Sequence, residues 1–181
     1  MVGAALGLIG TRGRAALAQA QTPPAPERIL RPRKGDKLVF ASGPNAGKAV
    51  TPEGLAEGGP QALVWAADPV TGIVRDGSRL NQALVVRLPA DSLEEVSRER
   101  SAGGVVAYSA ICTHAQCPVT EWRKELGRLH CPCHNSEYDP RENAKVVNGP
   151  ALRQLAALPL GLEDGVLVVA EPFIGKIGAQ A

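Results

Sequence analysis

The sequence predicts an all-β fold of antiparallel strands, and three observations point to it. With 20 Gly and 15 Pro among its 181 residues, the chain turns too often for long helices. Short apolar runs recur between the turns, and they do not alternate with helices as a parallel α/β sheet requires. Aromatic residues make up only 3% of the chain, so Val, Leu, Ile and Ala must supply the core.

The apolar runs give the candidate strands in order along the chain. The turn at residues 163–165 contains Asp-Gly, which suits the left-handed conformations of a two-residue hairpin turn. This turn is a hairpin signal directly before the last strand. The candidate strands are residues 38–40, 62–66, 73–75, 84–88, 105–110, 128–130, 145–147, 155–158 and 166–169.

One short helix is expected at residues 92–100. Ser92 and Glu95 have the spacing of a capping box, and Gly103 with Gly104 stops the element. The segment 43–48 has three residues between its glycines and no Ser or Thr after its lysine, so it does not fit a phosphate-binding loop. We predict a turn there.

Residues 1–20 have features of an export signal. Segments 16–18 and 18–20 both show the small-x-small pattern of a signal-peptidase site. The apolar run at the start lacks a preceding positive charge and is too short to cross a bilayer, so we expect a longer signal or anchor upstream, of twin-arginine type. An Ala-rich cytosolic tail is the alternative. Residues 21–36 contain four prolines and predict a stiff linker, and residues 37–175 predict the folded domain.

The formal charge of +2 arises from Arg12 and Arg14 in this N-terminal segment, because the rest of the chain is balanced. A balanced domain does not point to nucleic acid or to an anionic membrane surface as a partner. We expect membrane association only through an upstream segment.

All four cysteines and two of the three histidines fall in two short boxes. Sixteen residues separate His114 in the first box from Cys131 in the second. Chance does not readily place every cysteine beside a histidine, twice, in a chain so poor in both. The boxes are Cys112-Thr113-His114-Ala115-Gln116-Cys117 and Cys131-Pro132-Cys133-His134-Asn135-Ser136-Glu137-Tyr138-Asp139.

This pairing suits a 2Fe-2S cluster, whose two irons each need two protein ligands. Two thiolates on one iron and two neutral imidazoles on the other leave little negative charge on the site. The reduction potential then lies hundreds of millivolts above that of an all-thiolate cluster. One Cys and one His from each of two loops is what a cluster held between two hairpin tips requires.

Other interpretations of these residues remain open. Structural zinc suits the same ligands, although Cys117 and Cys133 would then lack a role. Two plain disulfides would explain the cysteines but not the histidines. His130 matches no ligand position and is expected to be a strand histidine that faces solvent. Trp65, Trp122 and Tyr108 are expected to pack in the core or beside the site.

The two boxes resemble those of the Rieske family over about residues 108–151. The resemblance implies the Rieske fold, an antiparallel β-sandwich base with a small rubredoxin-like cluster-binding subdomain and one short helix. It also implies one 2Fe-2S cluster. By position, Cys112 and Cys131 resemble the ligands of the inner iron, and His114 and His134 resemble those of the outer, solvent-side iron.

The resemblance extends to residues around the ligands. Cys117 and Cys133 match the pair that forms a disulfide in the high-potential branch of the family. Ser136 and Tyr138 match hydroxyls that donate to a bridging sulfide and to the first-box cysteine sulfur. The dipeptide Gly149-Pro150 matches a turn that covers the cluster.

These matches imply the high-potential, respiratory branch, since the Rieske domains of ring-hydroxylating dioxygenases lack the disulfide pair. A structural disulfide also agrees with export. We expect a periplasmic one-electron carrier, soluble or anchored at the outer face of the inner membrane. It would act as the electron-transfer subunit of an oxidoreductase complex and pass electrons towards a c-type cytochrome.

Two larger partners fit this role, and a free soluble carrier is a weaker option. One is a molybdenum enzyme resembling arsenite oxidase, and the other is the cytochrome b of a bc-type quinol–cytochrome c oxidoreductase. Ala115 and Gln116 stand where the bc-type family usually has leucine and glycine. They predict a smaller and wetter docking tip, which favours the first partner over a quinol site.

Overall fold

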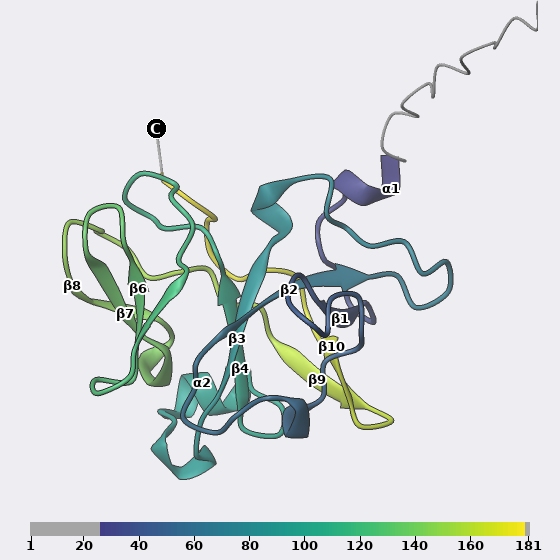
Figure 1. Cartoon of the computed structure of the whole chain (residues 1–181), viewed down its shortest axis with the longest axis horizontal. Coiled ribbons are helices and arrows are strands. Elements are labelled where there is room, and N and C mark those ends of the chain that lie inside the picture. Colours follow the sequence, from purple (N-terminus) through teal and green to yellow (C-terminus); the bar gives the residue numbers. More distant parts are fainter. Residues whose placement is uncertain (1–25, 180–181) are drawn as a thin grey trace, which may run out of the picture.

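The computed structural model describes residues 26–179, and the signal or anchor expected at residues 1–20 lies outside this part. The described chain forms short strands with few and short helices (Figure 1). The helices are α1 Pro26–Ile29 and α2 Glu95–Glu99. The 3-10 turns are Pro52–Gly54, Arg79–Asn81, Ala90–Ser92 and Pro140–Glu142. The strands are β1 Lys37–Phe40, β2 Ala62–Ala67, β3 Ala83–Arg87, β4 Val105–Ser109, β5 Glu121–Arg123, β6 Arg128–Cys131, β7 Ser136–Asp139, β8 Lys145–Asn148, β9 Leu160–Glu163 and β10 Val166–Val169.

The base of the molecule is a six-stranded sheet with the order β4-β3-β2-β1-β10-β9, in which every pair is antiparallel. Its last hairpin turns at Asp164 and Gly165, whose φ angles are +50° and +78°. These are the two left-handed residues that the Asp-Gly signal predicts, so the hairpin is confirmed.

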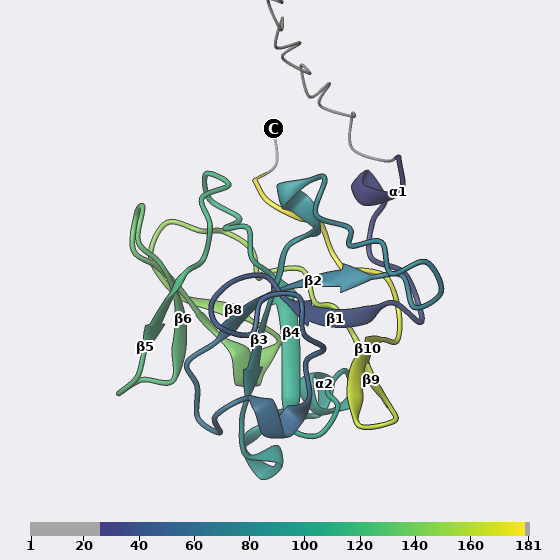
Figure 2. The ribbon, with the colours of Figure 1, turned by 45° about the vertical axis from the view of Figure 1, so that its right-hand side comes forward.

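The second sheet has four antiparallel strands in the order β5-β6-β7-β8. It is inserted in the chain between β4 and β9, and in both views it lies to the left of the strands β1, β2, β9 and β10 (Figures 1 and 2). The all-β antiparallel fold class predicted from the sequence is therefore confirmed.

One apolar cluster joins the two sheets. Leu84 and Tyr108 of the base pack in the same buried group as Leu129 and Tyr138 of the small sheet, and Cys112 and Cys131 belong to this group too. A second cluster around Leu38 and Leu167 fills the base alone. The small sheet therefore shares a close-packed interior with the base, which fixes its loops in place.

The segment 26–36 differs from the extended linker that its prolines predict. Its start packs on the loop 75–81, where the fully buried Asn81 donates to the carbonyl of Leu30 at 2.8 Å. Further on, Asp36 is buried and accepts two hydrogen bonds from the buried guanidinium of Arg75, at 2.5 and 2.8 Å. Because these polar groups are buried and paired, the segment is part of the folded domain.

The predicted helix begins later than expected. It spans residues 95–99, and the Ser92 hydroxyl donates to the carbonyl of Pro89 instead of capping it. Residues 73–75 and 155–158 form isolated bridges rather than strands, and β5, β7 and β9 were not expected. Residues 44–47 form the predicted turn. Among the described residues, no helix has the length and apolar character needed to cross a membrane.

Candidate metal centre

Three loops meet around the cysteines and histidines of the two boxes. Loop 1 (residues 110–118) lies between β4 and β5, loop 2 (residues 132–135) connects β6 to β7, and loop 3 (residues 149–153) follows β8. Loop 1 is closed at its base by a bridge between Ile111 and Pro118. Loop 2 is the tip of a hairpin whose last pair is Cys131 with Ser136.

A disulfide between Cys117 and Cys133 ties loop 1 to loop 2. A disulfide bond was predicted, and this is the pair that the resemblance implies. The two cysteines are 16 residues apart in the sequence. By chain entropy, closing a loop of this length stabilises the fold by about 3 kcal/mol. The sulfur of Cys131 lies within 4.8 Å of both bonded sulfurs, but a disulfide has no thiolate to offer a metal. The bond therefore organises the loops rather than supplying ligands.

The other two cysteines, Cys112 and Cys131, are free thiols, each 1% exposed. Burial acts to raise the pKa of Cys112, but hydrogen bonds from the Tyr138 hydroxyl and from the backbone N–H of His114 outweigh it, so this pKa is lowered. Burial raises the pKa of Cys131, and the neighbouring Cys112 raises it further. Ionisation of one thiol therefore disfavours ionisation of the other, and a bound cation would reduce the repulsion between the two thiolates.

The rings of His114 and His134 lie edge to face, with their centroids 4.7 Å apart. His114 is half-buried, and its Nδ1 atom is buried without a hydrogen-bond partner among the described residues. His134 is exposed. A buried imidazole nitrogen without a partner is costly, so this atom points to a missing ligand.

Tyr138 closes the buried side of loop 1. Its hydroxyl lies 3.2 Å from the sulfur of Cys112 and accepts from the backbone N–H of Thr113, also at 3.2 Å. The hydroxyl proton is therefore left to point at the sulfur or at the Thr113 hydroxyl, 3.3 Å away. The Thr113 hydroxyl in turn donates to the carbonyl of Arg153 in loop 3.

Loop 3 packs directly on loop 2. The buried hydroxyl of Ser136 accepts from the backbone N–H of Ala151 at 3.2 Å, which leaves its own proton free to donate. Gly149 has a φ of +83°, and a Cβ atom there would lie 2.5 Å from the carbonyl oxygen of Asn135 and from the Cα of Ser136. Only glycine permits this approach.

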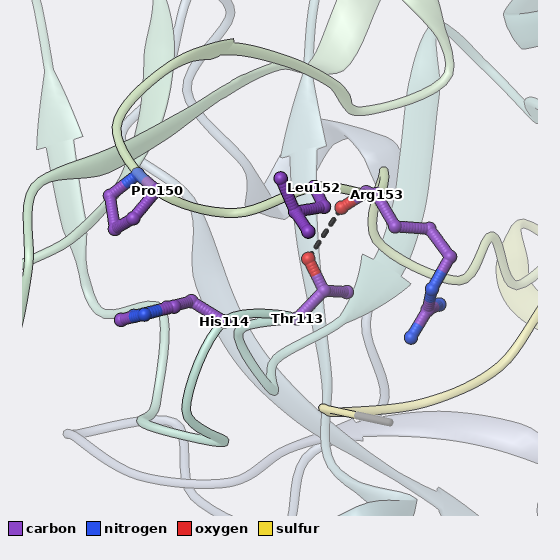
Figure 3. Close-up of a pocket in the computed structure, with 5 residues that line it drawn as sticks. All are labelled: Thr113, His114, Pro150, Leu152 and Arg153. Carbon is purple, nitrogen blue, oxygen red and sulfur yellow. Dashed lines mark hydrogen bonds between the residues drawn. The ribbon is translucent and has the colours of Figure 1, made fainter. Parts of the chain in front are cut away.

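A hollow of about 300 Å³ opens beside His114. In Figure 3 the His114 ring reaches beneath Pro150, and the Arg153 side chain turns away from it. Leu152 on its rim is 98% exposed, the largest value among the exposed large apolar side chains of the described residues. Of the residues that line this hollow, His114 and Pro150 were predicted from the sequence, whereas Thr113, Leu152 and Arg153 were not. A large apolar residue two positions after Pro150 was the available signal for Leu152.

The tip of loop 1 differs in part from the expectation. Ala115 is exposed, as a small docking tip requires. The amide of Gln116 is not left to water, because Arg79 donates to its carbonyl and side-chain oxygens at 3.1 and 3.3 Å. Gln116 is therefore half-buried and paired, and it makes the tip less wet than the sequence predicts.

His130 is not a solvent-facing histidine, and that prediction is wrong. It is 2% exposed, and both ring nitrogens have polar neighbours. In a strand with one apolar face, polar residues are expected to face solvent. The sequence pattern therefore did not predict that His130, next to loop 2, is buried.

The donor set fits a 2Fe-2S cluster with mixed ligation. Two buried thiols lie on the inner side of the loops, and two imidazoles lie nearer the surface, one with a buried nitrogen that lacks a partner. Two hydroxyl groups with protons to donate flank them. Two thiolates and two imidazoles are the ligands that such a cluster takes.

Comparison with known proteins agrees with this geometry. Residues 78–159 match the family model described as Rieske [2Fe-2S] domain. The chain is 38% identical over 104 residues to the cytochrome bc1 complex Rieske iron-sulfur subunit of Corynebacterium glutamicum, which covers 54% of this chain and 26% of that protein. It is 39% identical over 106 residues to the putative respiratory nitrate reductase subunit Rieske of Haloferax mediterranei, which covers 58% and 47%.

The chain thus spans about a quarter and about half of the length of these two relatives. Among solved structures, the plasma membrane Rieske protein PetC3 from Synechocystis PCC 6803 is similar at 24% identity and a TM-score of 0.39, over 59% of this chain and 84% of that one. Residues 78–159 of this chain are therefore a Rieske domain, which binds a 2Fe-2S cluster.

Proposed function

We propose that this chain is an exported protein that transfers single electrons through a high-potential Rieske cluster. Cys112 and Cys131 hold one iron, and His114 and His134 hold the other. The observation that carries the proposal is the pair of buried free thiols beside two adjacent imidazoles, one with an unpartnered buried Nδ1 atom.

When bound by these groups, a 2Fe-2S cluster supplies a one-electron couple at a potential well above that of an all-thiolate site. The buried thiols keep their end of the site away from water. The imidazole of His134 is exposed, so electrons are exchanged at the histidine end. The Tyr138 hydroxyl donates to the Cys112 sulfur, and the Ser136 hydroxyl donates on the loop 2 side. Both bonds favour the reduced state, because it carries more negative charge.

Ligand variants test this assignment. Cys112→Ser and His134→Ala should each abolish cluster binding, measured as iron and acid-labile sulfide per chain and by the visible absorption of the cluster. His130→Gln is the matched control, because it alters the remaining histidine of the chain and should keep the iron. Full iron content in His134→Ala, or its loss in His130→Gln with a retained fold, would contradict the ligand set.

Two features support export and a place in a larger complex. The Cys117–Cys133 disulfide ties the two ligand loops together, and structural disulfides persist in oxidising compartments. The relatives named above are subunits of a cytochrome bc1 complex and of a putative respiratory nitrate reductase. We place this chain in the periplasm, soluble or anchored at the outer face of the inner membrane.

The partner we favour is a larger oxidoreductase subunit, such as a molybdenum enzyme, with a c-type cytochrome as electron acceptor. The methyl group of Ala115 offers little apolar surface at the exposed tip. Replacing leucine by alanine there removes about 2 kcal/mol of apolar contact at ~0.8 kcal/mol per methylene. The alternative is the Rieske subunit of a bc-type quinol–cytochrome c oxidoreductase. Leu152 favours it, since this exposed side chain beside His114 offers apolar contact from loop 3.

Co-purification from the native host distinguishes the two partners. We expect the full-length protein to be recovered with a large dehydrogenase subunit and to reduce a c-type cytochrome in stopped-flow mixing. Recovery in a stable complex with a cytochrome b, sensitive to a compound that locks the Rieske domain at the quinol site, would overturn the favoured partner.

A further inference from the structure

His130 is a buried polar side chain that electron transfer through the ligands does not use. It lies in β6 directly before Cys131 and is 2% exposed. Its Nδ1 atom is 2.9 Å from a carboxylate oxygen of Glu121. Its Nε2 atom is 3.2 Å from Oδ1 of Asn135 and 3.0 Å from a guanidinium nitrogen of Arg123. Such a set of contacts holds the ring in one orientation.

The orientation is set by the small sheet. His130 pairs with Glu121 on β5 and with Glu137 on β7, so the three side chains form a row across one face. A carboxylate can only accept, so Nδ1 carries a proton towards Glu121. The Nε2 atom is thereby directed towards loop 2. Because Nε2 then accepts, it takes hydrogen bonds from the Arg123 guanidinium and from the Asn135 amide with the NH2 group of that amide turned towards the ring.

Asn135 is the residue that this contact reaches, and its backbone is unusual. Its φ is +60°, in the left-handed region that asparagine tolerates better than most residues. It lies between His134 and Ser136 in the sequence, and its carbonyl oxygen is packed against Gly149 of loop 3. Loop 2 is therefore held from two sides, by His130 through the side chain and by loop 3 through the backbone.

We propose that His130 is a positioning residue that fixes loop 2 through Asn135, and so sets the orientation of the His134 imidazole and the Ser136 hydroxyl. This inference rests on the proposed function, in which those two groups bind and tune the cluster. Loss of the link should let loop 2 shift, which weakens the hydrogen bond from Ser136 and lowers the reduction potential.

The test uses the full-length, cluster-loaded protein. Asn135→Gly keeps the left-handed backbone accessible but removes the amide link, and His130→Gln removes the ring. Each should retain the cluster, lower its potential and change the g values of its EPR spectrum. The double variant should shift no further than the larger single shift, because both changes break one link.

Asn143→Gly is the matched control. Asn143 is also left-handed, with a φ of +54°, and its side chain accepts from Arg100 at 2.8 Å, outside the three loops. It should lower the melting temperature and leave the potential and EPR spectrum unchanged.

Wild-type potential and EPR spectrum in cluster-loaded Asn135→Gly would overturn the inference, and so would additive shifts in the double variant. If His130→Gln fails to fold, Asn135→Gly decides alone, because it alters an exposed residue. Failure of the wild-type protein to bind a cluster would instead overturn the proposed function, and the two failures are therefore distinguishable.

Discussion

At the residue scale, two hydroxyl groups are aimed by hydrogen bonds that they accept. Ser136 accepts from Ala151, so its own proton is free to donate. Tyr138 accepts from Thr113, so its proton points at the Cys112 sulfur or at the Thr113 hydroxyl. A hydrogen bond to a charged group contributes about 1.5–3 kcal/mol, of which we assign half to the difference between redox states. Since ~1.4 kcal/mol corresponds to about 59 mV for one electron, Ser136→Ala and Tyr138→Phe should each lower the potential by about 30–60 mV in a redox titration.

Tyr108→Phe is the control for these variants. The Tyr108 hydroxyl is buried and donates to the carbonyl of Pro140 at 2.7 Å rather than to the site. Its loss should cost about 1 kcal/mol of stability and leave the potential unchanged. Unchanged potentials in both Ser136→Ala and Tyr138→Phe would show that the two hydroxyls do not reach the cluster.

Gly149 gives a second prediction at this scale. Gly149→Ala places a methyl group 2.5 Å from the backbone of Asn135, so loop 3 must move off loop 2 and the iron content should fall sharply. Gly165→Ala is the matched control, since Gly165 has a φ of +78° but open space around it. It should cost roughly 1–2 kcal/mol in thermal unfolding without loss of iron. Normal iron content in Gly149→Ala would contradict the packing of the two loops.

Single residues also show which features of the site can be predicted from the sequence and which cannot. The spacing of the two boxes pointed to one site, and the resemblance to the Rieske family implied the Cys117–Cys133 disulfide that the structure contains. The burial of His130 and the pairing of Gln116 with Arg79 could not be read in this way. Both depend on side chains from distant segments, and no local pattern encodes them.

At the element scale, α1 is fastened to the loop 75–81. The Arg28 guanidinium, hydrogen-bonded to Asp76 at 2.7 Å, lowers the pKa of Asp76, and the amide of Gly77 donates to the carbonyl of Arg28. The pKa of Asp76 is lower in the folded protein than in the unfolded chain, where it is about 3.9. The ion pair therefore stabilises the fold at pH values above the unfolded pKa, and this stabilisation is lost as the pH falls through the folded pKa. Hydrogen-exchange protection of the Gly77 amide should therefore fall below about pH 4.

Two comparisons control this experiment. Asp76→Asn should show the reduced protection of Gly77 already at neutral pH. The amide of Val50, which donates to Leu38 inside the base, should stay protected in both proteins. Protection of Gly77 that does not change with pH would show that the ion pair does not fasten α1.

The elements that the sequence missed share a physical reason. The strand β7 reads Ser-Glu-Tyr-Asp and β5 has three residues, so neither presents an apolar run. Both are stabilised by pairing with β6 rather than by their own composition. Conversely, residues 155–158 are apolar and buried but make only isolated bridges, because burial alone does not make a strand.

At the scale of the whole molecule, the three loops of the site are supported by one apolar cluster that both sheets share. The apolar cluster that contains Cys112 and Cys131 spans both sheets, and the disulfide joins loop 1 to loop 2. Loop 3 packs on loop 2 at Gly149. Such packing suits the proposed electron transfer, because a site that moves little between redox states reorganises little when an electron is transferred.

Metal analysis and EPR of the purified protein test whether this chain carries a Rieske cluster on two cysteines and two histidines. We expect two irons and two acid-labile sulfides per chain, since one 2Fe-2S cluster is bound. After reduction, the EPR spectrum should have the low average g value of mixed histidine and cysteine ligation. Iron-free protein that holds stoichiometric zinc, or a reduced spectrum typical of an all-thiolate cluster, would contradict a Rieske cluster on these four residues.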